Sequence, residues 1–259
     1  MASRLPRPCT RASMMINKPL LTVLTALMGV LPLAASAGAL SPFKAVYEVH
    51  RGNLGLGEAE FSLQPWGDRP ECMAYRAEAH PRALIRVFVG EISDKSFFCV
   101  EDGRIRVQTF QHWEENDEED SYELRFDWDK GTVSYSHGGS MKLPADAVDP
   151  FSLHLAARQW LENVEDPKNV EPRDFVLIDE DEVKTYRLAV TDHGRIKVPA
   201  GEFDYVQIER VDDPKRKLRF LAAPSLAFLP IRVEHQKRDD PVFKTELVKL
   251  PEPPTAATE

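Results

Sequence analysis

The chain has 259 residues, with 33 Lys and Arg against 42 Asp and Glu and a formal net charge of −9. This acidic balance disfavours binding to nucleic acid or to anionic lipid headgroups and permits a cationic partner. The seven histidines of the chain show no H-x-H or H-x-x-x-H spacing, so we predict neither a metal site nor a cofactor.

The first 37 residues have the pattern of a secretory signal peptide. A basic lead ends at Lys18, an apolar run of about 15 residues covers 19–33, and Ala35-Ser36-Ala37 follows. The apolar run is shorter than the roughly 20 residues that span a bilayer. We therefore predict cleavage after Ala37, a soluble periplasmic protein and no transmembrane span. Cleavage removes four basic residues and no acidic one, which lowers the formal net charge from −9 to −13.

Residues 38–250 predict a β-rich domain because alternating apolar residues dominate them. Short turn segments such as Glu101-Asp102-Gly103 and Asp129-Lys130-Gly131 separate neighbouring strands, as in antiparallel hairpins. The glycine-rich segment 52–57 lacks the spacing of a phosphate loop and predicts a hairpin turn. The strands predicted in this half are 43–50, 58–64, 73–79, 96–100, 104–110, 122–128 and 132–136.

One segment predicts a helix packed on this sheet. Asp149 is a good N-cap residue, and Pro150 suits the first helical position. Apolar residues then recur at intervals of three or four, which predicts a helix over 150–163. A shorter helical turn near 82–89 is ambiguous because of its β-branched residues.

Strand patterns resume after the helix, and the proline-rich tail 251–259 predicts disorder. The pattern fits a single curved sheet and also fits two β lobes joined by the helix. We predict a mainly β single domain, in which antiparallel strands form a strongly curved sheet or incomplete barrel with one packed α-helix. The strands predicted in this half are 174–178, 183–191, 195–198, 203–211, 217–221, 230–235 and 243–250.

Two cysteines, Cys72 and Cys99, remain after the predicted cleavage. An even number of cysteines in an exported protein predicts a disulfide, and the absence of a C-x-x-C spacing argues against a redox role.

Large apolar residues on the inward strand faces and on the helix are the candidate binding residues. Two interpretations are open. These residues fill an ordinary core, or part of the interior that they surround stays open for an acyl chain or another apolar ligand. The candidates are Tyr47, Phe61, Tyr75, Phe126, Trp128, Phe151, Leu155 and Trp160.

The sequence predicts no catalytic residues, because no G-x-S-x-G motif occurs. Our leading hypothesis is a non-catalytic exported envelope protein that binds an apolar or amphiphilic small molecule between sheet and helix. One alternative is an assembly module that docks a basic envelope protein on the acidic segment 114–120, which lacks the ligand spacing of a calcium loop. A further alternative is an envelope glycan or lipid hydrolase.

Three segments carry a family resemblance. Residues 148–153 (VDPFSL) resemble the D-P-x-S-L helix start of a bacterial periplasmic family catalogued as domain of unknown function 3108. Residues 198–204 resemble its P-x-G-x-F-D turn, and 222–233 resemble its segment W-L-A-P-D-x-x-x-L-P-V-R, with Ser225 where aspartate is common. The resemblance covers about residues 43–250. It implies an exported, mostly β protein without an assigned activity, so no catalytic residue is carried over.

Overall fold

The computed structural model describes residues 40–252, so the predicted signal peptide and nearly all of the predicted tail lie outside the described residues. The two α-helices are α1 (Ala83–Val89) and α2 (Leu153–Glu162), and a 3-10 turn covers Pro224–Leu226. The strands before α2 are β1 (Phe43–Arg51), β2 (Leu54–Pro65), β3 (Cys72–Pro81), β4 (Ile92–Glu101), β5 (Arg104–Glu114), β6 (Tyr122–Asp127), β7 (Thr132–Tyr135), β8 (Ser140–Lys142) and β9 (Ala147–Val148). The strands after α2 are β10 (Arg173–Asp179), β11 (Glu182–Val198), β12 (Gly201–Arg210), β13 (Arg216–Ala223), β14 (Leu229–Lys237) and β15 (Phe243–Leu247).

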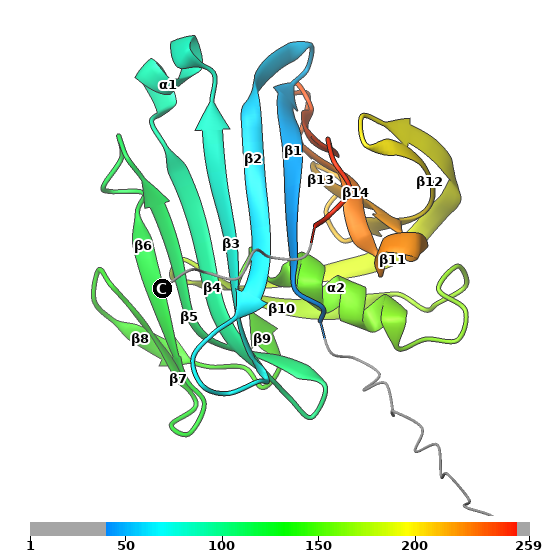
Figure 1. Ribbon diagram of the computed structural model, residues 1–259. Helices are drawn as coiled ribbons and strands as arrows, with labels where there is room; N and C mark the ends of the chain where they lie inside the picture. The colour runs from blue at the N-terminus through cyan, green and yellow to red at the C-terminus, as the bar shows by residue number, and fades with distance from the viewer. Residues whose placement is uncertain (1–39, 253–259) are drawn as a thin grey trace, which may run out of the picture. The chain divides into compact units, whose positions relative to one another are not determined.

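These strands form one sheet that is not closed into a barrel, and the predicted fold class is confirmed. In residues 40–252 the strand order is β8-β7-β6-β5-β4-β3-β2-β1-β15-β14-β13-β12-β11-β10-β9. The first eight strands form one meander and the last six another, and antiparallel pairing of β1 with β15 joins them. Figure 1 shows β1 where the blue-to-green strands meet the orange and red ones. The short edge strand β9 pairs parallel with β10.

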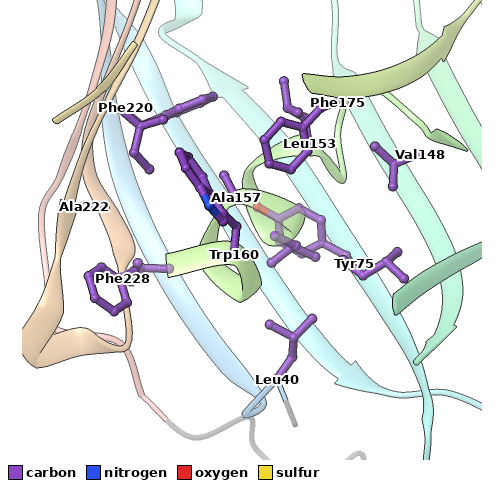
Figure 2. Close-up of a cluster of buried hydrophobic side chains, with 14 of the residues drawn as sticks. Leu40, Tyr75, Val148, Leu153, Ala157, Trp160, Phe175, Phe220, Ala222 and Phe228 are labelled. Carbon is purple, nitrogen blue, oxygen red and sulfur yellow. The ribbon is translucent and has the colours of Figure 1, made fainter. Parts of the chain in front are cut away.

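Helix α2 lies inside the curve of this sheet. Seven of its residues are buried, including Leu155 and Leu161. Figure 2 shows Leu153, Ala157 and Trp160 of α2 among side chains from both meanders, with Tyr75 on one side and Phe220 on the other. Because the sheet surrounds the helix, apolar contacts cover more of α2 than the single stripe of a surface helix.

The helix begins three residues later than the predicted 150–163. Asp149 caps a turn that precedes the helix, because its Oδ1 accepts a hydrogen bond from Ser152 N at 2.7 Å. The first helical hydrogen bond then runs from Ala156 N to Ser152 O. The sequence signal for a helix start therefore lies one turn ahead of the helix itself. The ambiguous segment 82–89 is also helical, as α1.

The short strands β8 and β9 were not predicted, and the predicted strand 243–250 ends at Leu247 as β15. Two further differences concern a turn. Segments 183–191 and 195–198 belong to the single long strand β11, whose register with β12 shifts between Val190 and Asp192. A β-bulge therefore occurs beside the break between the two predicted strands. In the first hairpin only Gly52 and Asn53 connect β1 to β2, and the rest of the glycine-rich segment belongs to β2.

The predicted disulfide is present. Cys72 of β3 and Cys99 of β4 are direct cross-strand partners, and their sulfur atoms are bonded. None of the helices in the described part of the chain is long and apolar enough to cross a membrane.

Candidate functional site

A cavity of about 450 Å³ lies between the inner face of the sheet and the start of α2. Helix α2 and the turn before it contribute Pro150, Phe151, Leu153 and His154 to the lining of this cavity. The two meanders supply the other walls, so the cavity exists only because the sheet curves around the helix. The strand residues that line it are Tyr47, Phe61, Tyr75, Ala77, Asp94, Phe110, His112, Tyr122, Leu177, Tyr186, Leu218, Phe220, Leu229, Pro230, Val233, His235, Phe243 and Thr245.

Four of the eight sequence-predicted binding residues meet at this cavity. The rings of Tyr75 and Phe151 are stacked with centroids 4.1 Å apart, and Tyr47 meets Phe61 edge-on at 5.0 Å. Phe61 also lies 6.1 Å from Phe151, which joins the pairs into one cluster. Aromatic rings arranged in this way offer a large, rigid apolar surface to a ligand.

The other four predicted residues lie away from the cavity. Leu155 and Trp160 are buried in the core around α2, and Trp160 packs against Phe175. Phe126 stacks on Trp128, whose Nε1 donates a hydrogen bond to the Val107 carbonyl oxygen at 2.7 Å. Leu155, Trp160 and Phe126 are filled-core residues, and Trp128 is partly buried against that core. Inward direction alone could not distinguish them from the cavity residues.

Sequence reasoning missed the cavity residues of the second meander. The cavity is also lined from β13, β14 and β15, by Phe220, Val233, His235 and Thr245. Figure 2 shows Phe220 on the side of α2 opposite Tyr75. Val233 is the direct cross-strand partner of Thr245. Their inward alternation was visible in the predicted strands, but the contact of these strands with the N-terminal meander was not.

Two buried tyrosines bring hydroxyl groups to the cavity, and both find partners. The Tyr47 hydroxyl donates to the Pro230 carbonyl oxygen at 2.8 Å, and the Tyr75 hydroxyl donates to His154 Nε2. Burial raises the pKa of both hydroxyls, so both stay protonated. Burial, aided by the nearby charge of Arg158, lowers the pKa of His154 to about 3. His154 is therefore neutral at neutral pH, as an imidazole that accepts a hydrogen bond must be.

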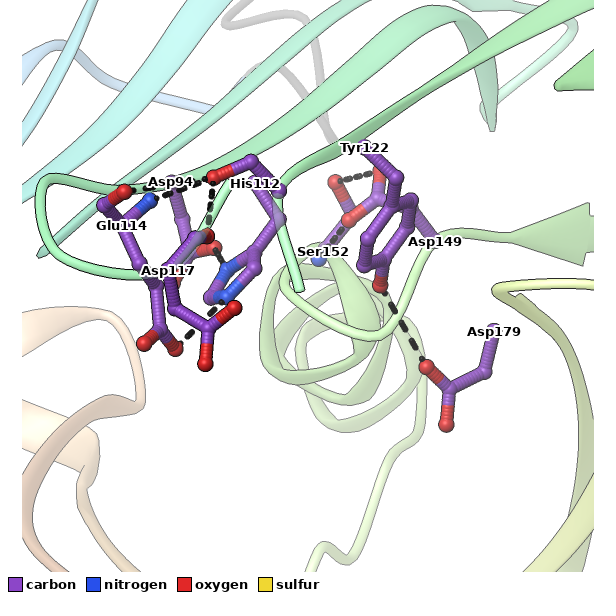
Figure 3. Close-up of polar contacts among 9 residues, drawn as sticks. Asp94, His112, Glu114, Asp117, Tyr122, Asp149, Ser152 and Asp179 are labelled. Atoms are coloured by element: carbon purple, nitrogen blue, oxygen red, sulfur yellow. Dashed lines mark hydrogen bonds and ion pairs between the residues drawn. The ribbon is translucent and has the colours of Figure 1, made fainter. Parts of the chain in front are cut away.

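One wall of the cavity, on β4 and β5, carries a charged cluster. His112 contacts Asp94 Oδ1 through Nδ1 at 2.7 Å and Glu114 Oε1 through Nε2 at 3.1 Å (Figure 3). The hydrogen bond with Asp94 is the main cause that raises the pKa of His112 to about 9, although burial opposes it. At neutral pH the cluster is therefore an imidazolium held between two carboxylates, with a net negative charge.

A second polar group fixes the helix start. Asp149 is fully buried and accepts a hydrogen bond from the Ser152 hydroxyl at 2.8 Å (Figure 3). It accepts another from the Ser96 hydroxyl at 2.6 Å. Burial raises the pKa of Asp149 to about 6, although these hydrogen bonds oppose the shift. The bond from Ser96 ties the turn before α2 to β4. It thereby holds Phe151 and His154 against the cavity.

The charged cluster is not arranged for catalysis by a neutral histidine. A general base must be unprotonated, whereas His112 is protonated at neutral pH and both of its nitrogens contact carboxylates. Within residues 40–252 no group of three or more His, Cys, Asp or Glu side chains is placed to hold a metal ion.

One solved structure supports the fold. The chain is similar to a beta-barrel-like protein of domain of unknown function DUF1849 from Brucella abortus, with a TM-score of 0.55 and 13% sequence identity over 85% of this chain and 100% of that chain. It also matches MucB with a TM-score of 0.35 and 12% identity, over 87% of this chain and 57% of that chain. At these identities the first match shows the fold alone, and the second carries no argument.

The family assignment rests on sequence. No curated protein matches the chain significantly. The model of the family described as "Protein of unknown function (DUF3108)" matches residues 46–248, nearly the whole described domain. This match confirms the resemblance carried by the helix start and the two C-terminal segments. The chain belongs to the DUF3108 family of proteins of unknown function.

Proposed function

We propose that this protein is an exported, non-catalytic envelope protein that binds an apolar or amphiphilic small molecule in the cavity between the sheet and α2. The observation that carries the proposal is the cavity of about 450 Å³ with the aromatic cluster of Tyr47, Phe61, Tyr75 and Phe151 at its wall. Small-molecule sites are typically concave, largely apolar and about 300–1,000 Å³ in volume. The cavity has these properties.

Its polar groups suit binding rather than reaction. Tyr47, Tyr75 and His154 have their hydrogen-bonding groups turned to protein partners, so the wall offered to a ligand is mostly aromatic and aliphatic. Export is supported by the signal-peptide pattern in residues 1–37 and by the disulfide, since disulfides persist in oxidising compartments.

The test is native mass spectrometry on protein purified from the periplasm without detergent, beside a denatured sample. We expect an excess mass of a few hundred daltons, on the order of one small amphiphile, that disappears on denaturation. The denatured mass should correspond to a chain that starts at Gly38. A native mass equal to that of the bare chain would contradict the bound ligand. A denatured mass that still includes residues 1–37 would contradict export.

A cavity-filling variant locates the ligand. Thr245→Phe places a ring in the cavity from β15, and Thr185→Phe makes the same change at an exposed position of β11. We expect the excess mass to be lost in Thr245→Phe and kept in Thr185→Phe. If a folded Thr245→Phe protein keeps the excess mass, the ligand binds outside this cavity.

A further inference from the structure

A second cavity, of about 370 Å³, adjoins the first at the ends of β1, β13 and β14. The two cavities share the lining residues Tyr186, Leu218, His235 and Phe243. We call the second one the basic groove, because five of its lining residues are Arg51, Arg210, Arg216, Lys217 and Lys237. Asp240 is its one acidic lining residue among those described.

The strand register explains why the apolar and basic surfaces meet. Leu218 pairs with His235, His235 with Phe243, and Phe243 with Arg51, so these residues form one row across four strands. Two residues closer to the end of the sheet, Arg216 pairs with Lys237. Because side chains alternate along a strand, Arg216 and Lys237 face the same side as Leu218 and His235. The inward apolar rows of several strands thus end in basic residues at the same end of the sheet.

Most of these cations form no ion pair within the part of the chain that the structure describes. Arg210 is paired with Asp212 at 2.6 Å and stacks on the Tyr186 ring at 3.7 Å. Arg51, Arg216, Lys217 and Lys237 take part in no ion pair among residues 40–252. Neighbouring like charges repel one another, and in a chain of net charge −9 such a cluster stands out as an anion-binding surface.

We propose that the ligand is an anionic amphiphile, with its apolar chain in the cavity and its phosphate or carboxylate head in the basic groove. This inference rests on the proposed function and adds the charge and orientation of the ligand. Another wall of the cavity, on β4 and β5, carries Asp94 and His112 of the net negative cluster that Glu114 completes, and this cluster repels an anionic head. Guanidinium and ammonium groups bind phosphate and carboxylate through charge-assisted hydrogen bonds.

The test compares two lysolipids with the same acyl chain, anionic lysophosphatidylglycerol and zwitterionic lysophosphatidylcholine, below their micelle concentrations. Native mass spectrometry follows both the filling of empty sites and the displacement of co-purified ligand. The basic-groove variant is Arg216→Gln/Lys237→Gln, because both side chains face the cavity side of the sheet. Its control, Lys142→Gln/Lys168→Gln, removes the same charge from two exposed lysines outside both cavities. Glycerol 3-phosphate serves as the free head group.

We expect lysophosphatidylglycerol to bind more tightly than lysophosphatidylcholine. The basic-groove variant should lose about tenfold in affinity for the anionic lipid and less than about twofold for the zwitterionic one, and the control variant should change neither. Glycerol 3-phosphate should bind far more weakly, because it has no chain to bury.

The contrary outcomes separate the two proposals. Equal binding of both lipids, unchanged in the basic-groove variant but lost in Thr245→Phe, would overturn the anionic head and leave the proposed function standing. Glycerol 3-phosphate bound as tightly as lysophosphatidylglycerol would overturn the amphiphile. If neither lipid binds, or if Thr245→Phe binds both as the natural chain does, both proposals fail.

Discussion

Gly57 lacks a side chain because the neighbouring strand leaves no room for one. A Cβ at this position would lie 2.3 Å from the His80 carbonyl oxygen and 2.8 Å from Pro81 Cα. Both are backbone atoms of β3, which cannot move aside as a flexible side chain could. The glycine-rich segment after β1 is therefore partly a turn and partly a close approach between two strands.

We predict that Gly57→Ala lowers the free energy of unfolding by about 1–3 kcal/mol through this clash. Gly194→Ala is the matched control in β11, because its Cβ would meet only the Tyr205 side chain, at 3.3 Å. Urea unfolding followed by fluorescence measures both. Equal effects at the two positions would show that strand propensity, and not the contact with β3, determines the cost.

His154 should make the protein less stable in acid. The unfolded chain protonates this imidazole below its ordinary pKa of 6.5, whereas the folded chain, with a pKa of about 3, does not. Between these values the unfolded state binds more protons, so stability falls as the pH falls. From pH 6.5 to 4.5 we expect the natural chain to lose up to about 2 kcal/mol relative to His154→Gln, which keeps an acceptor for Tyr75.

Asp149 acts in the opposite direction over part of this range. Its folded pKa of about 6 exceeds the ordinary value of 3.8, so the folded state binds more protons between them and the contribution of Asp149 improves as the pH falls. The natural chain and His154→Gln both contain Asp149, so its contribution cancels in the difference between their stabilities. Unfolding curves at several pH values measure that difference, and parallel curves for the two proteins would contradict a neutral buried His154.

At the scale of elements, the disulfide fixes one strand pair that also forms the cavity wall. It joins β3, which carries Tyr75 and Ala77, to β4, which carries Asp94. The bond closes a chain segment with a sequence separation of 27. A cross-link of this length restricts the unfolded chain substantially.

We predict that Cys72→Ala/Cys99→Ala lowers the free energy of unfolding by about 3–4 kcal/mol. The natural chain measured with reductant provides the comparison, because it lacks the bond but keeps both sulfur atoms. The free energies of unfolding of the double variant and of the reduced natural chain should agree to within about 1 kcal/mol. Equal stability of the oxidised and reduced natural chain would rule out this stabilisation.

The elements differ in how well local sequence predicted them. The turn Glu101-Asp102-Gly103 was predicted correctly, and Asp102 and Gly103 have φ values of 50° and 71°. Such a turn depends on a few adjacent residues. The start of α2 was placed too early, because Asp149 also bonds to Ser96, which lies 53 residues away in the sequence. A distant partner of this kind leaves no local signal.

At the scale of the whole molecule, pairing of β1 with β15 creates both proposed binding surfaces. Tyr47 pairs with Leu247 and Arg51 pairs with Phe243 in the same ladder. This ladder brings the inner faces of the two meanders around α2 and aligns their basic ends. The acidic net charge of the chain by itself disfavours anionic lipid, but net charge is an average over the surface. The basic groove is a local exception to that average.

By itself, the sequence determined the β-rich class, the hairpin turns, the presence of α2, the disulfide cysteines and the family. All of these depend on periodicity, turn chemistry or short motifs, which act over a few residues. Only the tertiary structure decided which inward aromatic residues line a cavity and which fill the core. Tyr75 and Trp160 look alike in the sequence, but curvature of the sheet leaves space beside one and packs Phe175 against the other. That space depends on contacts between residues far apart in the chain, and local patterns do not encode them.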